Sequence, residues 1–439
     1  MTAFDGSSAS RRADFGSALL LPACAGLLLF GTALGLVAQY AAERRLFVAV
    51  ALMEGAVYAA GVAFVLRGKG QGRLVLILGA AAALRLAALA APVYLSTDIN
   101  RYVWDGRVQA AGINPYRYIP TDPHLRFLRD RRVFPHINRN NYAPTIYPPA
   151  AEMLFFAATR FGGGRVTVKL FLVALEALGI WALARVLRLA GRPPETILLY
   201  AWHPLPVWEI AGSGHVDAAT VALIALALWA GIAGRRGACG SALAAATLTK
   251  FFPSVIGPAL WRPPDWRLPA TFVATIVLLY LPYIGVGSRV LGFLPGYVAE
   301  ENIASGSGIW LLDIVRAVAP LPTLAYAGLA ALVMGSLALA ALRRPPGAEA
   351  SLAWAAILFA AALFIVSPHY PWYFVPLVAL LALAPPGLLW WPALWPTLAA
   401  PLLDWHPVTG IVPGWVGDTI YGGFVLLAAW SLARRWRAA

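Results

Sequence analysis

The stretch from Ser96 to Arg107 follows an apolar run and carries two carboxylates and an arginine at helical spacing, Asp98, Arg101 and Asp105. Because residues three and four apart share a helix face, a helix beginning at Asp98 would place all three on one side. A carboxylate can remove a proton from an acceptor hydroxyl, and an arginine can stabilise a departing phosphate. This combination suits an inverting glycosyl transfer, but a helix-capping aspartate with an interfacial salt bridge explains the composition equally well.

The same loop carries a basic segment further along the chain. Residues 122–132 have arginines spaced as on one face of an amphipathic helix in the membrane interface. Attraction to lipid headgroups explains this segment slightly better than contact with a substrate phosphate. The candidate phosphate or headgroup residues are Arg126, Arg129, Arg131 and Arg132. Tyr147 then precedes a short apolar segment, 150–161, which is too short to cross a bilayer and is expected to re-enter or lie in the interface.

Two polar features lie beyond this loop. His215 and Asp217 form a titratable pair in a glycine-containing turn between apolar runs. Hydrogen bonding to a sugar or phosphate and a purely structural turn both account for them. Lys250 lies within an apolar stretch, where an ammonium group is costly unless it pairs or faces water. We expect it to meet a phosphate or one of the acids; a structural ion pair is the alternative.

A third polar turn, Ser367 to Tyr373, interrupts two apolar runs with prolines and aromatic residues. Its aromatic rings could stack on a sugar or anchor the chain at the membrane interface, and taken alone they favour anchoring. The candidate substrate-binding residues here are His369, Tyr370 and Trp372. Asp404, near the last turn, is expected to be structural.

The composition identifies the solvent of this protein as lipid. Of its 439 residues, 60% are hydrophobic and 12% charged, and the mean hydropathy is +0.70. Soluble domains carry about twice as many charged residues. The net charge of +14 therefore indicates basic cytoplasmic loops and anionic headgroups rather than nucleic acid. The two cysteines lie in or beside apolar runs, so no disulfide is predicted.

Apolar runs long enough to span a membrane recur throughout the chain. We predict an all-α polytopic bundle of about 12–14 transmembrane helices with both termini in the cytoplasm, oriented by arginine and lysine in short loops. The predicted spans are 16–38, 46–66, 73–95, 166–188, 195–212, 216–233, 268–287, 322–342, 350–366, 371–384, 388–403 and 414–433.

Residues 238–261 are predicted to form a broken hairpin with Lys250 near its turn and Pro253 at the break. Such irregular backbone is tolerated only against protein or water. With this hairpin, the turns at His215, His369 and Asp404 all fall on the outer side, together with the large first loop and the loop 288–320. We divide the chain into five parts. They are a disordered cytoplasmic tail (1–15), N-terminal transmembrane helices (16–95), an extracytoplasmic catalytic loop with interfacial helices (96–165), a core transmembrane region (166–385) and C-terminal transmembrane helices (386–439).

The chain lacks a phosphate-binding glycine loop, a dinucleotide fingerprint, a zinc-ligand spacing and a serine-hydrolase elbow. No cofactor and no metal site are predicted. A site on the outer face has no access to cytoplasmic nucleotide sugars, so an enzyme there needs a membrane-borne activated sugar.

Several short motifs together resemble bacterial GT-C glycosyltransferases, especially polyprenol-phosphate-mannose-dependent mannosyltransferases. They lie between about 95 and 385 and comprise Asp98 with Arg101-Tyr102 and Trp104-Asp105-Gly106; Gly112 with Asn114-Pro115-Tyr116; Tyr147-Pro148-Pro149; Lys250 with Pro253; and Ser367-Pro368 with Tyr370-Pro371-Trp372-Tyr373. The resemblance implies that Asp98 is the essential acid of the first extracytoplasmic loop. That loop follows the third span here, whereas in the family it follows the first, so residues 16–66 look like an extension. Ile99 stands where distant relatives carry a second acid.

The combined prediction is an inverting enzyme of the bacterial plasma membrane that moves a hexose, mannose above all, from a polyprenyl-phosphate donor to a glycolipid or glycan acceptor outside the cell. Asp98 would be the general base, and Arg101, Lys250 and arginines of 126–132 would hold phosphate. The alternative is a transporter or flippase for a lipid-linked or anionic solute, which shares the midplane lysine and broken helices. A non-catalytic assembly partner would not need Asp98.

Overall fold

In the computed structural model, which describes residues 6–387, 389–406 and 412–438, every regular element is a helix. Seven of the described helical segments are long and apolar enough to cross a membrane, and they confirm an all-α polytopic membrane protein. They are Leu19–Tyr40 in α1, Arg44–Lys69 from α2, Arg165–Leu189 (α6), Arg267–Glu300 from α12 to α13, Thr323–Leu342 (α15), Ala348–Val366 (α16) and Gly414–Arg437 ending in α20. Shorter apolar helices are Leu74–Ala88 (α3), Asp217–Ile232 (α9) and Pro371–Leu383, which ends in α17.

The predicted disordered tail is wrong within the described residues. α1 (Gly6–Tyr40) is already helical at Gly6, well before the apolar part of the first span. Once an apolar helix has formed, each further residue adds one hydrogen bond without a new nucleation cost, so the helix extends into the preceding polar residues.

The continuous span predicted at 195–212 is also wrong. The chain there forms four short pieces, a 3-10 turn at Pro194–Ile197, α7 (Leu198–Ala201), α8 (Pro204–Pro206) and a π-helix, η5 (Val207–Gly212). Pro204 has no N–H group to continue the helix from α7, and the His203 ring accepts a hydrogen bond from the Leu205 N–H at 3.2 Å. The break brings η5 to the end of the bundle where the polar turn at His215 follows.

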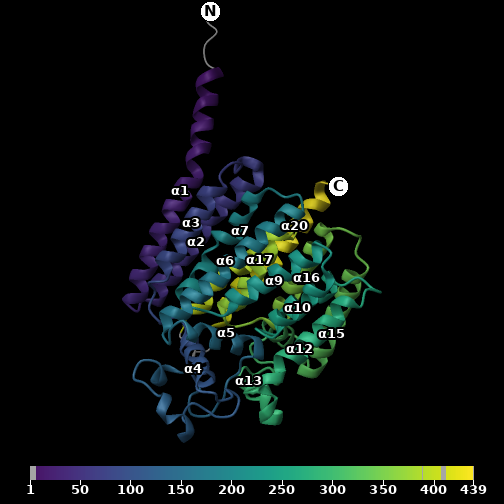
Figure 1. Ribbon diagram of the computed structural model, residues 1–439. Coiled ribbons are helices and arrows are strands. Elements are labelled where there is room, and N and C mark those ends of the chain that lie inside the picture. The colour runs from purple at the N-terminus through teal and green to yellow at the C-terminus, as the bar shows by residue number, and fades with distance from the viewer. Residues whose placement is uncertain (1–5, 388, 407–411, 439) are drawn as a thin grey trace, which may run out of the picture.

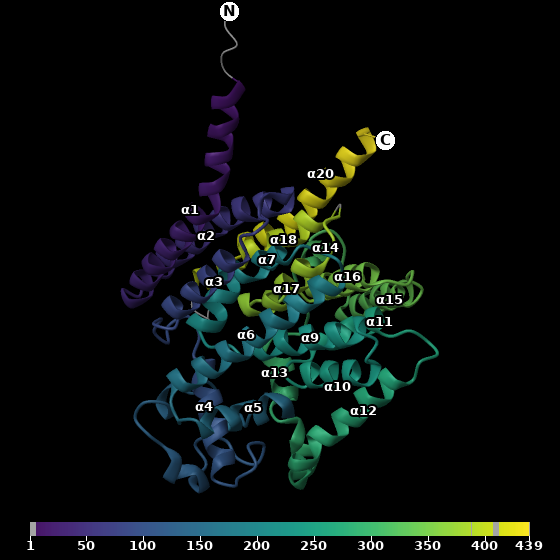
Figure 2. The same ribbon diagram turned by 45° about the horizontal axis from the view of Figure 1, so that its top comes forward.

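The segment 236–260 folds back on itself. α10 (Arg236–Thr247) ends before Lys250, and the chain returns through a 3-10 turn (Phe252–Ile256) and α11 (Gly257–Leu260). The Arg236 guanidinium lies 3.4 Å from the Leu260 carbonyl oxygen, so the two ends of the fold-back meet while Lys250 lies at its far end. Figure 2 shows α10 between α9 and α12.

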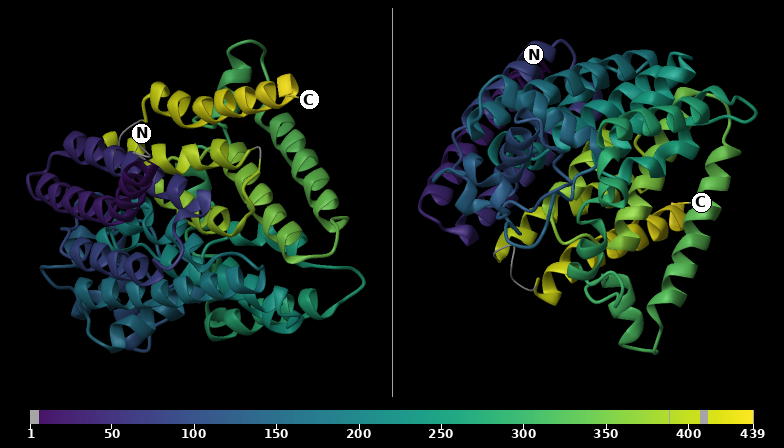
Figure 3. Two further views of the ribbon diagram at one scale, coloured as in Figure 1. Left: turned by 90° about the horizontal axis from the view of Figure 1, so that it is seen from above. Right: turned by 60° about the horizontal axis from the view of Figure 1, so that its bottom comes forward.

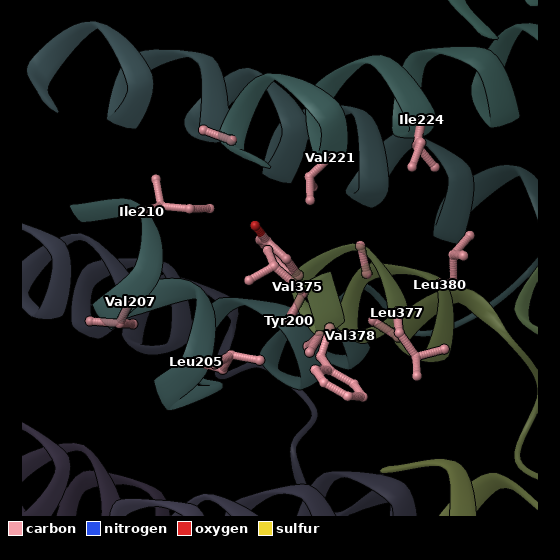
Figure 4. Close-up of a cluster of buried hydrophobic side chains, with 14 of the residues drawn as sticks. Tyr200, Leu205, Val207, Ile210, Val221, Ile224, Val375, Leu377, Val378 and Leu380 are labelled. Atoms are coloured by element: carbon pink, nitrogen blue, oxygen red, sulfur yellow. The ribbon is translucent and has the colours of Figure 1, made fainter. Parts of the chain in front are cut away.

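The core is formed by helices that are apolar on all sides. All nine residues of α17 (Val375–Leu383) are buried, as are most residues of α9. Figure 4 shows side chains of α9, such as Val221, facing Val375 of α17, with Tyr200 of α7 beside them. Because lipid does not drive apolar helices together, this close packing depends on shape and on polar contacts between helices.

A buried ion pair provides the strongest of these polar contacts. Arg85 of α3 donates to Glu176 of α6 through Nε at 2.9 Å and Nη2 at 2.7 Å. Its Nη1 donates to the Ala201 carbonyl at 2.6 Å, and the Tyr200 hydroxyl donates to Glu176 at 3.0 Å. The bidentate pair therefore ties α3, α6 and α7 together where water cannot reach.

The polar loops gather at one end of the bundle. In Figure 1 α4 (Asp98–Ala110), α5 (Pro149–Arg160) and α13 (Leu294–Glu300) lie at the bottom, whereas both termini lie at the top. Seen from above in Figure 3, α1 and α2 lie at one side of the bundle and α15 at the other.

We expect Glu176→Gln to destabilise the protein by about 3–5 kcal/mol, because it leaves the buried Arg85 charge uncompensated. Thermal unfolding in detergent should show the loss. Arg188→Gln, an exposed position on the same helix, serves as the control and should unfold like wild type. Equal stability of Glu176→Gln and the control would contradict the importance of the pair.

Candidate active site

The Asp98 carboxylate is held in a fixed orientation at the start of α4. Its Oδ1 accepts a hydrogen bond from the Asn138 side chain at 2.7 Å, and its Oδ2 accepts one from the Tyr147 hydroxyl at 3.2 Å. The side chain is only half-buried, so other molecules can reach it. Such an oriented and accessible carboxylate can act as a general base.

Arg101 lies one helical turn further but faces the protein interior. It is 2% exposed, and its Nη2 donates to the carbonyl oxygens of Asn138 at 3.0 Å and Ala143 at 3.2 Å. Its Nη1 lies 3.9 Å from Asp105. Arg101 thus braces the turn that presents Asn138 to Asp98, and its guanidinium is directed at backbone rather than at open space.

Asp105 and Glu152 form a buried pair of carboxyl groups behind this turn. Burial raises the pKa of Asp105 to about 6, although the charge of Arg101 opposes the shift. Burial and the charge of Asp105 raise the pKa of Glu152 well above its usual range. Glu152 accepts hydrogen bonds from Thr145 at 2.5 Å and from Gln109 at 2.9 Å. The pair therefore binds a proton more tightly than exposed carboxyl groups would, and Asp105, at 2% exposed, contacts protein groups.

A second group of polar residues surrounds Lys250. Its Nζ lies 2.5 Å from Asp217 Oδ2 and 5.9 Å from the ring centre of Trp372. Trp372 also packs against His215, with 4.2 Å between the ring centres. The structure thus brings together the turn at 215, the end of α10 and the turn at 372, which lie far apart in the sequence.

His215 links this group to Asp98. Burial lowers the pKa of His215 to about 4, while the charges of Asp98 and Asp217 partly offset the shift, so the imidazole is neutral at pH 7. Its Nδ1 lies 2.8 Å from Glu209 Oε2, but the ring is not aligned for a hydrogen bond. Among the described residues neither ring nitrogen has a hydrogen-bond partner, and neither does Asp217 Oδ1. These buried atoms are suited to binding hydroxyl groups.

The third polar turn contacts the loop that follows α13. His369 Nε2 lies 2.7 Å from the Gly308 carbonyl oxygen, and the Tyr370 hydroxyl donates to Glu301 at 2.8 Å. The Tyr370 ring stacks on Trp372 at 4.7 Å, with 6° between the planes. The turn thereby connects the Lys250 group to the segment 300–308.

The predicted amphipathic helix over 122–132 is wrong. The structure has a 3-10 helix, Pro123–Leu128, followed by a turn in which Asp130 Oδ1 accepts hydrogen bonds from the backbone N–H groups of Arg132 and Val133. The acidic residues thus satisfy local backbone groups instead of continuing a helix. Arg126, Arg131 and Arg132 are exposed, and the Arg129 guanidinium lies over the Phe134 ring. In the described part of the chain none of the four arginines has a polar contact with Asp98.

Three residues of the site were not identified from the sequence: Asn138, Arg139 and Glu209. Arg139 Nε donates to Glu300 at 2.5 Å, and Arg139 adopts a left-handed backbone with φ of 55°. A non-glycine residue in this conformation is strained by about 1–3 kcal/mol and is often found at functional sites. In the sequence Arg139 is one of several loop arginines, so only the fold distinguishes it. No group of three or more His, Cys, Asp or Glu residues within the described ranges could hold a metal ion.

The carboxyl pair predicts a pH dependence of stability. The folded protein holds protons that the unfolded chain releases near pH 4, so stability falls as pH rises from about 4 to about 6 through Asp105, and falls further through Glu152. Glu152→Gln cannot ionise and should flatten this decline between pH 5 and 8, measured by thermal unfolding. The exposed Glu349→Gln should keep the wild-type pH dependence. If the stability of Glu152→Gln fell with pH in parallel with that of wild type, the buried carboxyl pair would not be the group that holds the proton.

Comparison with known proteins identifies the family of the chain. Residues 43–261, about half of the chain, match the family model of the alpha-(1->6)-mannopyranosyltransferase N-terminal domain. The match extends from the start of α2 to the end of α11 and includes Asp98, Asp217 and Lys250. No curated protein matches the chain. The chain therefore belongs to the alpha-(1->6)-mannopyranosyltransferase family, within the GT-C mannosyltransferase group, and is a multi-pass membrane glycosyltransferase.

Proposed function

We propose that this enzyme transfers mannose from a polyprenyl-phosphate carrier to a glycolipid or glycan acceptor on the outer face of the bacterial plasma membrane. The observation that carries the proposal is the Asp98 carboxylate, fixed by Asn138 and Tyr147 and still accessible at the start of α4. The helix that begins with Asp98, α4, lies at the end of the bundle that is remote from both termini (Figure 1). The basic residues near the termini favour a cytoplasmic location for them, which puts Asp98 outside.

In the proposed reaction Asp98 accepts the proton of the acceptor hydroxyl. The hydroxyl oxygen attacks the anomeric carbon of mannose, and the bond from that carbon to the phosphate oxygen breaks with its electron pair going to the phosphate. A single displacement inverts the anomeric configuration. The two hydrogen bonds from Asn138 and Tyr147 keep the carboxylate aimed, so little reorganisation is needed during proton transfer.

The sugar would lie beside the group around Lys250. Neutral His215 can both donate and accept hydrogen bonds, and Asp217 has a free oxygen. The half-buried Tyr370 ring stacks on Trp372 next to this group, and His369 lies in the same turn. Such a mixture of aromatic faces and hydrogen-bonding groups suits a sugar ring.

The phosphate contacts expected of Arg101 and of the arginines in 126–132 are not part of this proposal. Arg101 binds the backbone of the loop, and the exposed arginines lie at its periphery. The exposed ones remain candidates for attracting anionic headgroups. Lys250 stays a candidate for donor binding, because 16% of its side chain is exposed.

Asp98→Asn should reduce mannosyl transfer by about 10²–10⁴-fold, because the amide cannot accept the hydroxyl proton but still accepts a hydrogen bond from Asn138 or Tyr147. Membranes containing the variant are supplied with labelled polyprenyl-phosphate mannose and assayed for product. The exposed Arg117→Gln, in the same loop, should retain activity. Transfer by Asp98→Asn at near the wild-type rate would remove Asp98 from the role of base.

A cysteine at position 124 tests which side of the membrane the loop occupies. His124 is exposed, while the native Cys24 and Cys239 are buried, so His124→Cys should react with an impermeant thiol reagent on intact cells. Lys69→Cys, exposed in the turn after α2, should react only after permeabilisation. The opposite pattern would place Asp98 in the cytosol and exclude the proposed donor side.

A further inference from the structure

Arg139 directly follows the residue that binds the carboxylate proposed as the base. The preceding residue, Asn138, donates its side-chain hydrogen bond to Asp98. Burial alone would lower the pKa of Arg139, but the hydrogen bond to Glu300 and the charges of Glu300 and Asp98 raise it. The guanidinium is therefore within electrostatic reach of Asp98, and 22% of the side chain is exposed.

The other cations near the site have partners that they cannot easily leave. Arg101 is buried against backbone carbonyl groups. Lys250 pairs with Asp217, which is 1% exposed and would become an uncompensated buried charge without it. Lys169 is buried and donates to the Ala91 carbonyl oxygen at 2.7 Å.

Arg139 differs because its partners lie on a separate, more exposed segment. Glu300 ends α13, and 30% of its side chain is exposed. Glu301 lies 3.9 Å from the guanidinium and is also bound by Tyr370. Removing Glu300 from Arg139 would return its carboxylate to water, so an incoming anion could replace it without stranding a charge inside the protein.

The segment that carries Glu300 contacts both the loop before α5 and the aromatic turn at 370–373. The Phe293 N–H group donates to the Thr145 carbonyl oxygen at 2.9 Å, and the Tyr297 and Tyr373 hydroxyl groups lie 3.1 Å apart. In Figures 1 and 2, α13 lies beside α4 and α5 at the same end of the bundle. If an anion replaced Glu300 as the partner of Arg139, the segment around α13 would therefore change its contacts with the site.

We propose that Arg139 binds the phosphate of the lipid-linked donor. In the free enzyme Glu300 binds the Arg139 guanidinium as an internal competitor, and the phosphate displaces it. The inference rests on the proposed function and specifies its donor site. The phosphate gains negative charge when its bond to the sugar breaks, so a guanidinium at this position stabilises the leaving group. Displacement of Glu300 also makes the segment around α13 responsive to the donor.

Equilibrium binding of a short probe, citronellyl phosphate, to the purified full-length protein tests the proposal without sugar transfer. Arg139→Asn should weaken binding at least about tenfold, because a charge-assisted contact is lost. Asparagine tolerates the left-handed backbone at this position, so the fold is retained. Glu300→Gln should strengthen binding about three- to tenfold, because a neutral amide competes less well for the guanidinium.

The control variant Arg117→Gln should bind like wild type, and citronellol, which lacks the phosphate, should bind all variants equally. Adding Glu300→Gln to Arg139→Asn should give no gain in affinity, because Glu300 then has no guanidinium group at position 139 for which to compete. Equal binding by wild type and Arg139→Asn would overturn this inference alone. Weaker or unchanged binding by Glu300→Gln would overturn the competitor role. Absence of phosphate binding to wild type would overturn both the inference and the proposed donor class.

Discussion

The organisation of the site depends on one buried guanidinium group, that of Arg101. It holds the carbonyl oxygens of Asn138 and Ala143, and so ties an irregular loop to the regular helix α4. The turn between these two residues carries the amide that orients Asp98 and the arginine that faces Glu300. Because the loop between α4 and α5 is mostly irregular, with two short 3-10 helices and few repeating hydrogen bonds, its side chains would not keep their positions without this contact.

Buried polar contacts also fix the helices within the bundle, where lipid cannot solvate polar groups. Arg85 pairs with Glu176, and Lys250 pairs with Asp217. Arg192 donates to the carbonyl oxygens of residues 382–384, which no longer have partners within α17. These three buried cations are thus matched by a carboxylate or by the carbonyl groups of a helix end. The breaks near Pro204 and Lys250 carry polar residues to the loop end of the bundle, where water or a substrate can meet them.

The site combines segments from all parts of the chain, and the family match covers only the first of them. Residues 43–261 supply Asp98, His215 and Lys250, whereas the aromatic turn at 370–373 and the acids at 300–301 come from the second half. Tyr370 joins the two later segments through Glu301, and Trp372 packs between His215 and Lys250. The proposed site therefore draws on both halves of the chain.

The sequence by itself determined the membrane class and the start of a helix at Asp98, because hydropathy and three-to-four spacing are local properties. It did not determine the broken segment near His203, the 3-10 turn at 123–128, or the separation of Arg101 from the accessible face of α4. The broken segment and the 3-10 turn follow from prolines and local side-chain caps that hydropathy does not record, whereas the orientation of Arg101 depends on hydrogen bonds to residues about 40 positions away. Only the tertiary structure distinguished Arg139 from the other loop arginines. Folding brings Glu300 and the charge of Asp98 near it, and local spacing does not predict these interactions.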